Sequence, residues 1–247
     1  MNLTGNTIFI PGGTSGIGLG LALRLRAAGN RVIIGGRRTH LLEAIAAENP
    51  GIETVEIDTA NAASVTRASA DVIARFPDTN VLIAMAGIMR AEDLRSADFL
   101  ATAEETVTTN LLGPIRLIAA FVEHLTSQAD AAIVTVSSGL AFVPLPLTPS
   151  YSATKAAIHS FTEVLRLQLA HSGVQVIELV PPAVQTDLMG HPDDPNGMPL
   201  EAFLDEVMQL LAATPGAKEI LVERVGMLRF AEAEGRYDEV LALLGAR

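Results

Sequence analysis

Short apolar runs alternate along the chain with longer segments that have the composition of helices. The runs are apolar at most positions, which is typical of strands buried on both faces of a parallel sheet. They predict strands at residues 7–11, 31–35, 53–57, 81–84, 131–136 and 175–180. The segments between them predict helices at residues 16–28, 39–49, 62–75, 101–125 and 151–171, the fourth with a bend at Gly113-Pro114.

This succession of strands and helices predicts an α/β protein with a Rossmann-like, doubly wound and mainly parallel sheet covered by helices on both faces. The alternation stops after Val180, where residues 181–199 form a proline-rich irregular stretch. We interpret residues 181–214 as an irregular substrate loop followed by a helix at 200–214. A short strand at 220–222 and one or two short helices within 229–244 complete the chain. With no repeat and no linker, residues 1–247 are expected to form a single domain.

The composition narrows the possible partners. The 247 residues are 49% hydrophobic and 18% charged, with a net charge of −11. This acidity disfavours nucleic acid, and no apolar run approaches the ~20 residues that cross a membrane. Residues 1–7 lack the features of a signal peptide and cysteine is absent, so we expect a cytoplasmic protein with neither nucleic acid nor membrane as partner. The five histidines show no metal-ligand spacing, so no metal site is predicted.

A glycine-rich turn connects the first strand to the first helix, with the sequence PGGTSGIG at residues 11–18. A helix start presents unpaired N–H groups and the positive end of the helix dipole, and glycines let the backbone approach a ligand closely. We therefore expect this turn to bind the phosphates of a dinucleotide; the alternative is a plain strand-to-helix turn. The expected contacts are Gly12, Thr14, Ser15, Gly16, Ile17 and Gly18.

The second strand leads into a pair of arginines, Arg37 and Arg38. In dinucleotide-binding folds an acidic residue at this place binds the ribose 2′-OH of NAD(H), whereas arginine accommodates the 2′-phosphate of NADP(H). No acidic residue occurs here before Glu43, and guanidinium groups bind phosphate in a fork. We predict that NADP(H) is preferred over NAD(H); the alternative is an exposed basic pair on a surface turn.

Tyr151 and Lys155 are four residues apart on a predicted helix and therefore share a face. The chain has only two tyrosines and two lysines, so this spacing carries weight. Reduction of a carbonyl needs a hydride at carbon and a proton at oxygen. Free tyrosine has a pKa of about 10, and a nearby ammonium favours the phenolate. We expect Tyr151 to act as acid/base and Lys155, helped by a cationic nicotinamide ring, to move the pKa of Tyr151 toward ~7.

Two further polar residues are candidates for the same site. Ser138 follows the fifth strand and could hydrogen-bond the substrate oxygen, with Ser137 as its rival and an ordinary turn serine as the alternative. Asn110 lies within the predicted helix at 101–125, where asparagine is a poor helix former. It could bend the helix or hold a water, or it could be a tolerated polar residue.

Together these residues resemble the short-chain dehydrogenase/reductase family, over about residues 3–188, and the tail is similar to a bacterial subgroup named for D-alanine-esterification-linked oxidoreductases. The resemblance implies that Tyr151 is the acid/base, Lys155 lowers its pKa and holds the ribose, Ser138 binds the substrate oxygen and Asn110 holds a water. It also implies a homodimer or homotetramer. The further cofactor contacts that it implies, beside the glycine-rich turn, the arginine pair, Tyr151 and Lys155, are Asp58, Ala86, Gly87, Pro181, Val184 and Thr186.

Three positions depart from the family pattern. Pro11 stands where the family's turn has threonine, Ala84-Met85 replaces two asparagines, and Pro181-Pro182 replaces Pro-Gly. All four catalytic positions persist, so the sequence favours an NADP(H)-dependent oxidoreductase that interconverts a ketone or aldehyde and an alcohol. The apolar segment at residues 140–147 predicts a mainly apolar substrate. The departures motivate an alternative, a catalytically silent dinucleotide-binding sensor or scaffold.

Overall fold

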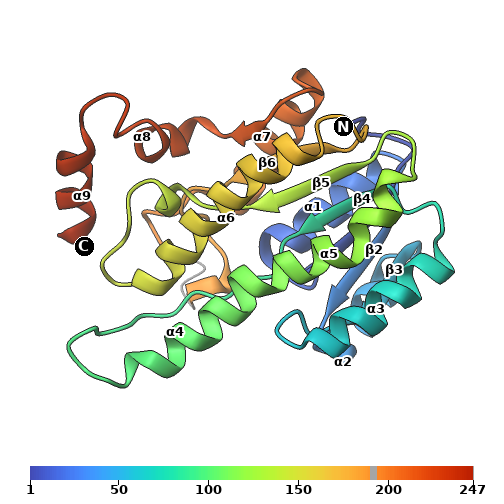
Figure 1. Cartoon of the computed structure of the whole chain (residues 1–247), viewed down its shortest axis with the longest axis horizontal. Helices are drawn as coiled ribbons and strands as arrows, with labels where there is room; N and C mark the ends of the chain where they lie inside the picture. Colours follow the sequence, from blue (N-terminus) through green and yellow to red (C-terminus); the bar gives the residue numbers. More distant parts are fainter. Residues whose placement is uncertain (190–193, 247) are drawn as a thin grey trace.

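A computed structural model describes residues 1–189 and 194–246, and its centre is a parallel sheet. Seven strands lie in the order β3-β2-β1-β4-β5-β6-β7 (Figure 1). The chain order reverses direction between β1 and β4, which is the switch point of a doubly wound fold. Their bounds are β1 Thr7–Pro11, β2 Arg31–Gly36, β3 Ile52–Glu56, β4 Val81–Ala84, β5 Ala132–Val136, β6 Gln175–Val180 and β7 Glu219–Leu221. The predicted fold class is therefore confirmed, with strand ends displaced by a residue at most.

Helices cover both faces of the sheet, because each strand carries apolar side chains on its two sides. Helices α1, α2 and α7 pack on one face of the sheet, each through a buried side chain: Leu21, Leu42 and Phe203 in turn. Helices α3, α5 and α6 pack on the other face in the same way, through Val72, Phe121 and Leu165. The bounds are α1 Gly16–Ala27, α2 Thr39–Glu48, α3 Ala62–Arg75, α4 Phe99–Val107, α5 Gly113–Thr126, α6 Pro149–Gln168, α7 Leu200–Ala213, α8 Gly226–Arg229 and α9 Tyr237–Gly245. No helix in the described part of the chain is long and apolar enough to cross a membrane.

The structure corrects the prediction in three places. The single helix expected at 101–125 is two helices, α4 and α5, joined by a π-helical turn at Thr108–Leu112. Helix α6 begins at Pro149, before Tyr151, because proline is well suited to the first turn of a helix. Helix α6 also ends earlier than predicted, at Gln168 instead of residue 171. The one or two short helices predicted within 229–244 are present as α8, which ends at Arg229, and α9.

The irregular stretch after β6 is partly ordered by short-range pairing. Val184 bridges to Met198, and Asp187–Met189 form a turn of 3-10 helix. Within the predicted substrate loop, residues 190–193 lie outside the described residues.

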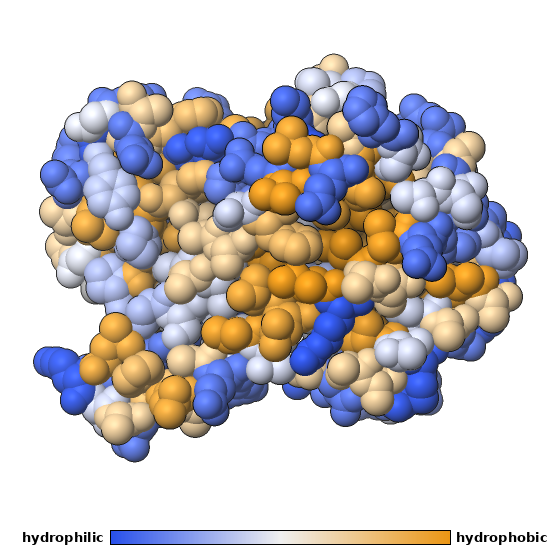
Figure 2. Space-filling model, in the orientation of Figure 1, coloured by the Kyte–Doolittle hydropathy of each residue, from blue (hydrophilic) through white to orange (hydrophobic). Residues whose placement is uncertain are grey.

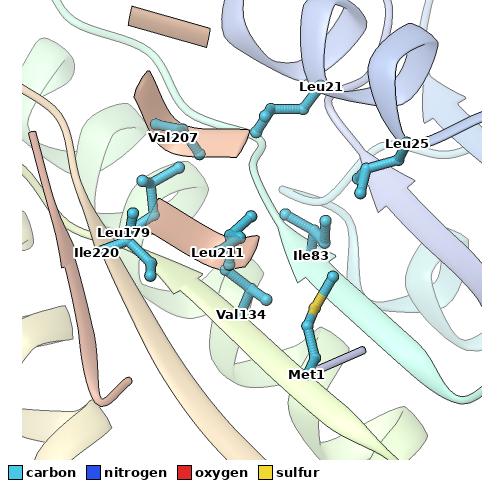
Figure 3. Close-up of a pocket in the computed structure, with 9 residues that line it drawn as sticks. All are labelled: Met1, Leu21, Leu25, Ile83, Val134, Leu179, Val207, Leu211 and Ile220. Atoms are coloured by element: carbon cyan, nitrogen blue, oxygen red, sulfur yellow. The ribbon is translucent and has the colours of Figure 1, made fainter. Parts of the chain in front are cut away.

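A small cavity of about 20 Å³ lies in the apolar core between α1, α7 and strands β4 to β7. Figure 3 shows its lining, which is entirely apolar: Met1, Leu21, Leu25, Ile83, Val134, Leu179, Val207, Leu211 and Ile220. A space of this size without polar groups is a packing gap, so the functional site must be sought elsewhere.

Candidate active site

The glycine-rich turn packs so closely that side chains are excluded from it. Gly12 has a φ of +93°, and a Cβ there would lie 2.7 Å from both Cα and N of Ala86. A Cβ on Gly18 would overlap the carbonyl oxygen of Gly12. Ser15 is the N-cap of α1, and its hydroxyl makes no capping bond within the described structure. The turn is therefore a cradle of bare backbone at a helix start, which fits the phosphates of a dinucleotide.

Thr14 and the two arginines meet at the ends of β1 and β2. The Arg38 guanidinium donates to Thr14 Oγ1 at 3.3 Å, and a Cβ on Gly36 would lie 2.6 Å from Thr14 Cγ2. Arg37 and Arg38 are both exposed. Asp58 follows β3 and is half-buried, with Oδ1 accepting from the Ala60 amide at 3.0 Å. The structure thus brings the predicted basic pair beside the predicted phosphate turn.

Tyr151 and Lys155 lie side by side on α6, as their spacing predicts. Both are buried, and Lys155 Nζ is 5.4 Å from the centre of the Tyr151 ring. Lys155 Nζ donates to the Val136 carbonyl at 2.8 Å, which fixes the side chain against the end of β5. Ser138, two residues past that carbonyl, is also buried, and its Oγ accepts from the Leu140 amide at 3.1 Å. Ser138, Tyr151 and Lys155 therefore converge at the carboxyl end of β5.

The pKa values of this pair differ from the sequence expectation. Burial raises the pKa of Tyr151 to about 12, although hydrogen bonding with Ser138 acts in the opposite direction. Burial also lowers the pKa of Lys155 to about 8, against the attraction of Glu178. The protein's own groups therefore raise the pKa of Tyr151, and the expected shift toward ~7, which included a cationic nicotinamide ring, stays a prediction. Desolvation of the phenolate outweighs what a buried ammonium contributes from this distance.

Asn110 sits in the π-helical turn between α4 and α5, which agrees with the alternative that it disturbs the helix. Its Oδ1 accepts from the Ile88 amide at 2.8 Å, and its Nδ2 donates to the Ile88 carbonyl at 2.7 Å. A Cβ on Gly87 would lie 3.4 Å from Asn110 Oδ1 and 3.9 Å from Lys155 Nζ. The segment after β4, which includes Ala86 and Gly87, is thereby held against both the lysine and the glycine-rich turn.

The segment after β6 approaches the same place from the other side. A Cβ on Gly16 would lie 3.3 Å from Thr186 Cγ2, so Thr186 faces the start of α1. The Pro181 carbonyl accepts from the Gly139 amide at 2.9 Å, which joins this segment to the one that carries Ser138. Val184 is held by its bridge to Met198. Apart from Tyr151 and Lys155, which lie on α6, the predicted cofactor contacts therefore come from the carboxyl ends of the strands or from the segments that follow them.

Sequence reasoning missed a buried ionic cluster behind Lys155. Glu178 of β6 is fully buried and bonds to His159 Nδ1, and Arg229 holds both carboxylate oxygens of Glu219 at 2.9 and 3.0 Å. Ligand atoms of His159, Glu178 and Glu219 lie within 4.8 Å of one another. Because Arg229 already neutralises Glu219, we interpret the cluster as an ion-pair network. Only Glu178, an acidic residue within an apolar run, could have signalled it from the sequence.

Comparisons with known proteins agree with this geometry. The family model for short chain dehydrogenases matches residues 6–196. The chain belongs to this family. The uncharacterized oxidoreductase DltE of Bacillus subtilis (strain 168) is 40% identical over 94% of this chain and 93% of its own length.

Solved structures of the family are also similar over nearly the whole chain. A short-chain dehydrogenase from Burkholderia cenocepacia J2315, in complex with NADP, is 31% identical with a TM-score of 0.85, covering 99% of each chain. An alcohol dehydrogenase from Thermococcus sibiricus, complexed with 5-hydroxy-NADP, is 26% identical with a TM-score of 0.74, covering 88% of this chain and 95% of its own. These likenesses support a nicotinamide dinucleotide as the cofactor of this short-chain dehydrogenase.

Proposed function

We propose that this short-chain dehydrogenase interconverts a ketone or aldehyde and an alcohol with NADP(H), using Tyr151 as the acid/base. The observation that carries the proposal is the convergence of buried Ser138, Tyr151 and Lys155 beside a backbone cradle shaped by Gly12 and Gly18. Proton donors and a dinucleotide cradle at one sheet edge are what a hydride-transfer enzyme needs.

Each side chain has a definite task in the proposed reaction. When bound, the reduced cofactor supplies the hydride that goes to the carbonyl carbon. The Tyr151 hydroxyl then donates its proton to the carbonyl oxygen, and Ser138 hydrogen-bonds that oxygen and orients it. The Lys155 ammonium stabilises the phenolate that remains on Tyr151. Asn110 anchors the Ile88 segment, so that Gly87 keeps its place beside Lys155.

The preference for NADP(H) over NAD(H) rests on the arginine pair. Arg38 is already oriented toward Thr14, at the side of the cradle where β2 ends, and Arg37 is exposed beside it. A 2′-phosphate there would receive charge-assisted hydrogen bonds, whereas a free 2′-hydroxyl would leave two cations without a partner.

The substrate is proposed to be mainly apolar, in contact with residues 140–147 and with the segment after β6. The proposal includes a homodimer or homotetramer, which exposed apolar side chains support. Figure 2 shows apolar residues gathered across the face on which α4, α5 and α6 lie. Those that protrude most on α4, the π-helical turn and α6 are Leu100, Val107, Leu112, Val164 and Leu167.

The first test is a titration with NADPH and, separately, NADH, followed by nicotinamide fluorescence. The chain has no tryptophan, so the protein contributes little emission of its own. A carbonyl panel with NADPH then compares wild type, Tyr151→Phe and Tyr237→Phe, which alters the only other tyrosine. Tyr151→Phe should lower kcat/KM by at least about 100-fold with NADPH binding kept. Failure to bind either nucleotide would contradict the proposal, and tight binding with no turnover of any carbonyl would favour the sensor or scaffold.

A further inference from the structure

Glu178 is an ionisable residue at a buried position inside the sheet, where apolar residues are usual. It lies in the middle of β6, between Ile177 and Leu179, and its exposed fraction is 0%. Its carboxylate oxygens accept from His159 Nδ1 at 3.0 and 2.9 Å. An ionised carboxylate is only an acceptor, so Nδ1 of this ring must carry the proton. A carboxylate buried this deeply is costly unless a positive charge compensates it.

The geometry places that carboxylate behind the active-site lysine. His159 is one helical turn beyond Lys155 on the same face of α6, so both point at the same part of the sheet. Lys155 Nζ bonds to the carbonyl of Val136, and Thr135, the residue before it, pairs in register with Glu178. Lys155 therefore lies over β5 at the level where Glu178 lies on the neighbouring strand.

Other charged groups around Glu178 have partners of their own. Glu219 of β7 is paired with Arg229 of α8, and both Glu163 of α6 and Glu178 itself also act on Arg229. Arg166 of α6 donates to the carbonyls of Val176 and Lys218, and Tyr151 and His159 are further titratable groups of α6. Of these acidic residues, only Glu178 acts on Lys155, where it opposes the lowering of the lysine pKa by burial.

We propose that Glu178 is a positioning residue of the reaction, whose buried carboxylate, fixed by His159, keeps Lys155 as an ammonium ion beside Tyr151. The proposal rests on the proposed function for its catalytic meaning. The effect of Glu178 on the protonation of Lys155 can be measured without a substrate. Without Glu178, the burial of Lys155 would be uncompensated, and the lysine would lose its proton at a lower pH.

The chain offers a direct measurement, because Lys155 and Lys218 are its only lysines. In a Lys218→Arg background, protein labelled with 13C-lysine gives a single side-chain Cε signal, whose chemical shift follows the ionisation of Lys155. The parent protein should titrate near pH 8. Glu178→Gln should lower this midpoint by about one pH unit, the order of magnitude by which one neighbouring charge moves a pKa in a partly buried setting.

Glu219→Gln is the matched control. It makes the same chemical change within the same cluster, at a carboxylate that is paired with Arg229, and it should lower the midpoint by clearly less than Glu178→Gln does. If Glu178→Gln fails to fold, Glu178→Asp takes its place, and the displaced carboxylate should lower the midpoint by part of that unit. An unchanged midpoint in the folded Glu178 variant, or an equal shift in Glu219→Gln, would overturn the proposal.

Kinetics connect the charge to the reaction. With midpoints one unit apart, kcat for carbonyl reduction by Glu178→Gln should fall about threefold at pH 7.5 and recover at pH 6, with KM unchanged. A merely structural role would lower kcat equally at both pH values, and that result would refute positioning through charge. If the lysine midpoint shifts while no carbonyl is reduced even by wild type, the proposed function fails. The effect of Glu178 on the protonation of Lys155 is then still supported.

Discussion

Gly12→Ala is the substitution for which the structure gives the sharpest expectation. The new Cβ would lie 2.7 Å from Ala86 Cα and N and 3.1 Å from the Met85 carbonyl carbon. Ordinary contacts between carbon atoms are about 3.5–4.0 Å, so the β4–Ala86 segment would have to withdraw by about 1 Å. Backbone atoms that directly follow a central strand cannot yield as a flexible side chain does, so the cradle itself should open.

The loss of stability expected for Gly12→Ala has two parts, backbone strain and steric overlap. The chain contains a control variant that separates them. Gly29 has a φ of +94°, almost equal to the +93° of Gly12, but nothing lies within 4 Å of its virtual Cβ. Gly29→Ala should therefore measure backbone strain alone, about 1–2 kcal/mol in the free energy of unfolding. Gly12→Ala should lose this amount and at least about 1–3 kcal/mol more, the usual cost of overpacking.

Urea unfolding and NADPH titration of the two variants test this reasoning. Gly29→Ala should bind NADPH with the wild-type Kd, because its turn lies at the opposite end of α1 from the cradle. Gly12→Ala should bind at least about tenfold more weakly, since an interface displaced by about 1 Å loses hydrogen bonds worth more than 1.4 kcal/mol. Equal stability of the two variants, or wild-type NADPH affinity in Gly12→Ala, would refute the steric argument.

Three further predictions concern the site. Lys155 has a pKa of about 8 in the fold and an ordinary value of 10.5, so the unfolded chain binds more protons between these values. The free energy of unfolding should therefore rise with pH from about 8 toward 10, by an amount on the order of 3 kcal/mol, and Lys155→Met should remove this slope in urea denaturation. Arg37→Ala/Arg38→Ala should weaken NADPH binding about 10- to 100-fold and leave NADH binding within about twofold, as measured by fluorescence titration. Asn110→Ala should leave both backbone groups of Ile88 without their side-chain partner, and thermal unfolding should show a loss of about 2–4 kcal/mol.

The sequence predicted the sheet well, and it predicted that the candidate site residues lie together, because both depend on local patterns. Apolar runs mark the strands, and the ends of parallel strands must share one edge, so Gly12, Arg38 and Ser138 could be placed together without coordinates. The helix spacing of Tyr151 and Lys155 likewise survives unchanged.

Features that depend on contacts between distant segments could not be predicted in this way. The π-helical turn holds Asn110 where it bonds to Ile88, which comes from a segment 22 residues earlier. The pKa of Tyr151 is governed by burial, which no spacing reveals. Glu178 and Glu219 were missed because their meaning depends on strand neighbours and on an arginine from the C-terminal segment.

The packing around the glycine-rich turn accommodates two of the departures from the family pattern, Pro11 and Met85. Pro11 cannot donate a backbone hydrogen bond, but it is the last residue of β1, and the amides of Gly12 and Gly13 donate to Gly35 and Ile10 in the turn that follows. Met85, in place of a family asparagine, packs against the apolar core, and its Cγ would lie 3.1 Å from a Cβ on Gly18. Met85 thus places an apolar side chain beside the glycine-rich turn where the family pattern has a polar residue. Any Cβ at position 18 would meet both this side chain and the Gly12 carbonyl oxygen, so the turn keeps its close packing despite the replacement, and this argues against a site that has drifted free of its function.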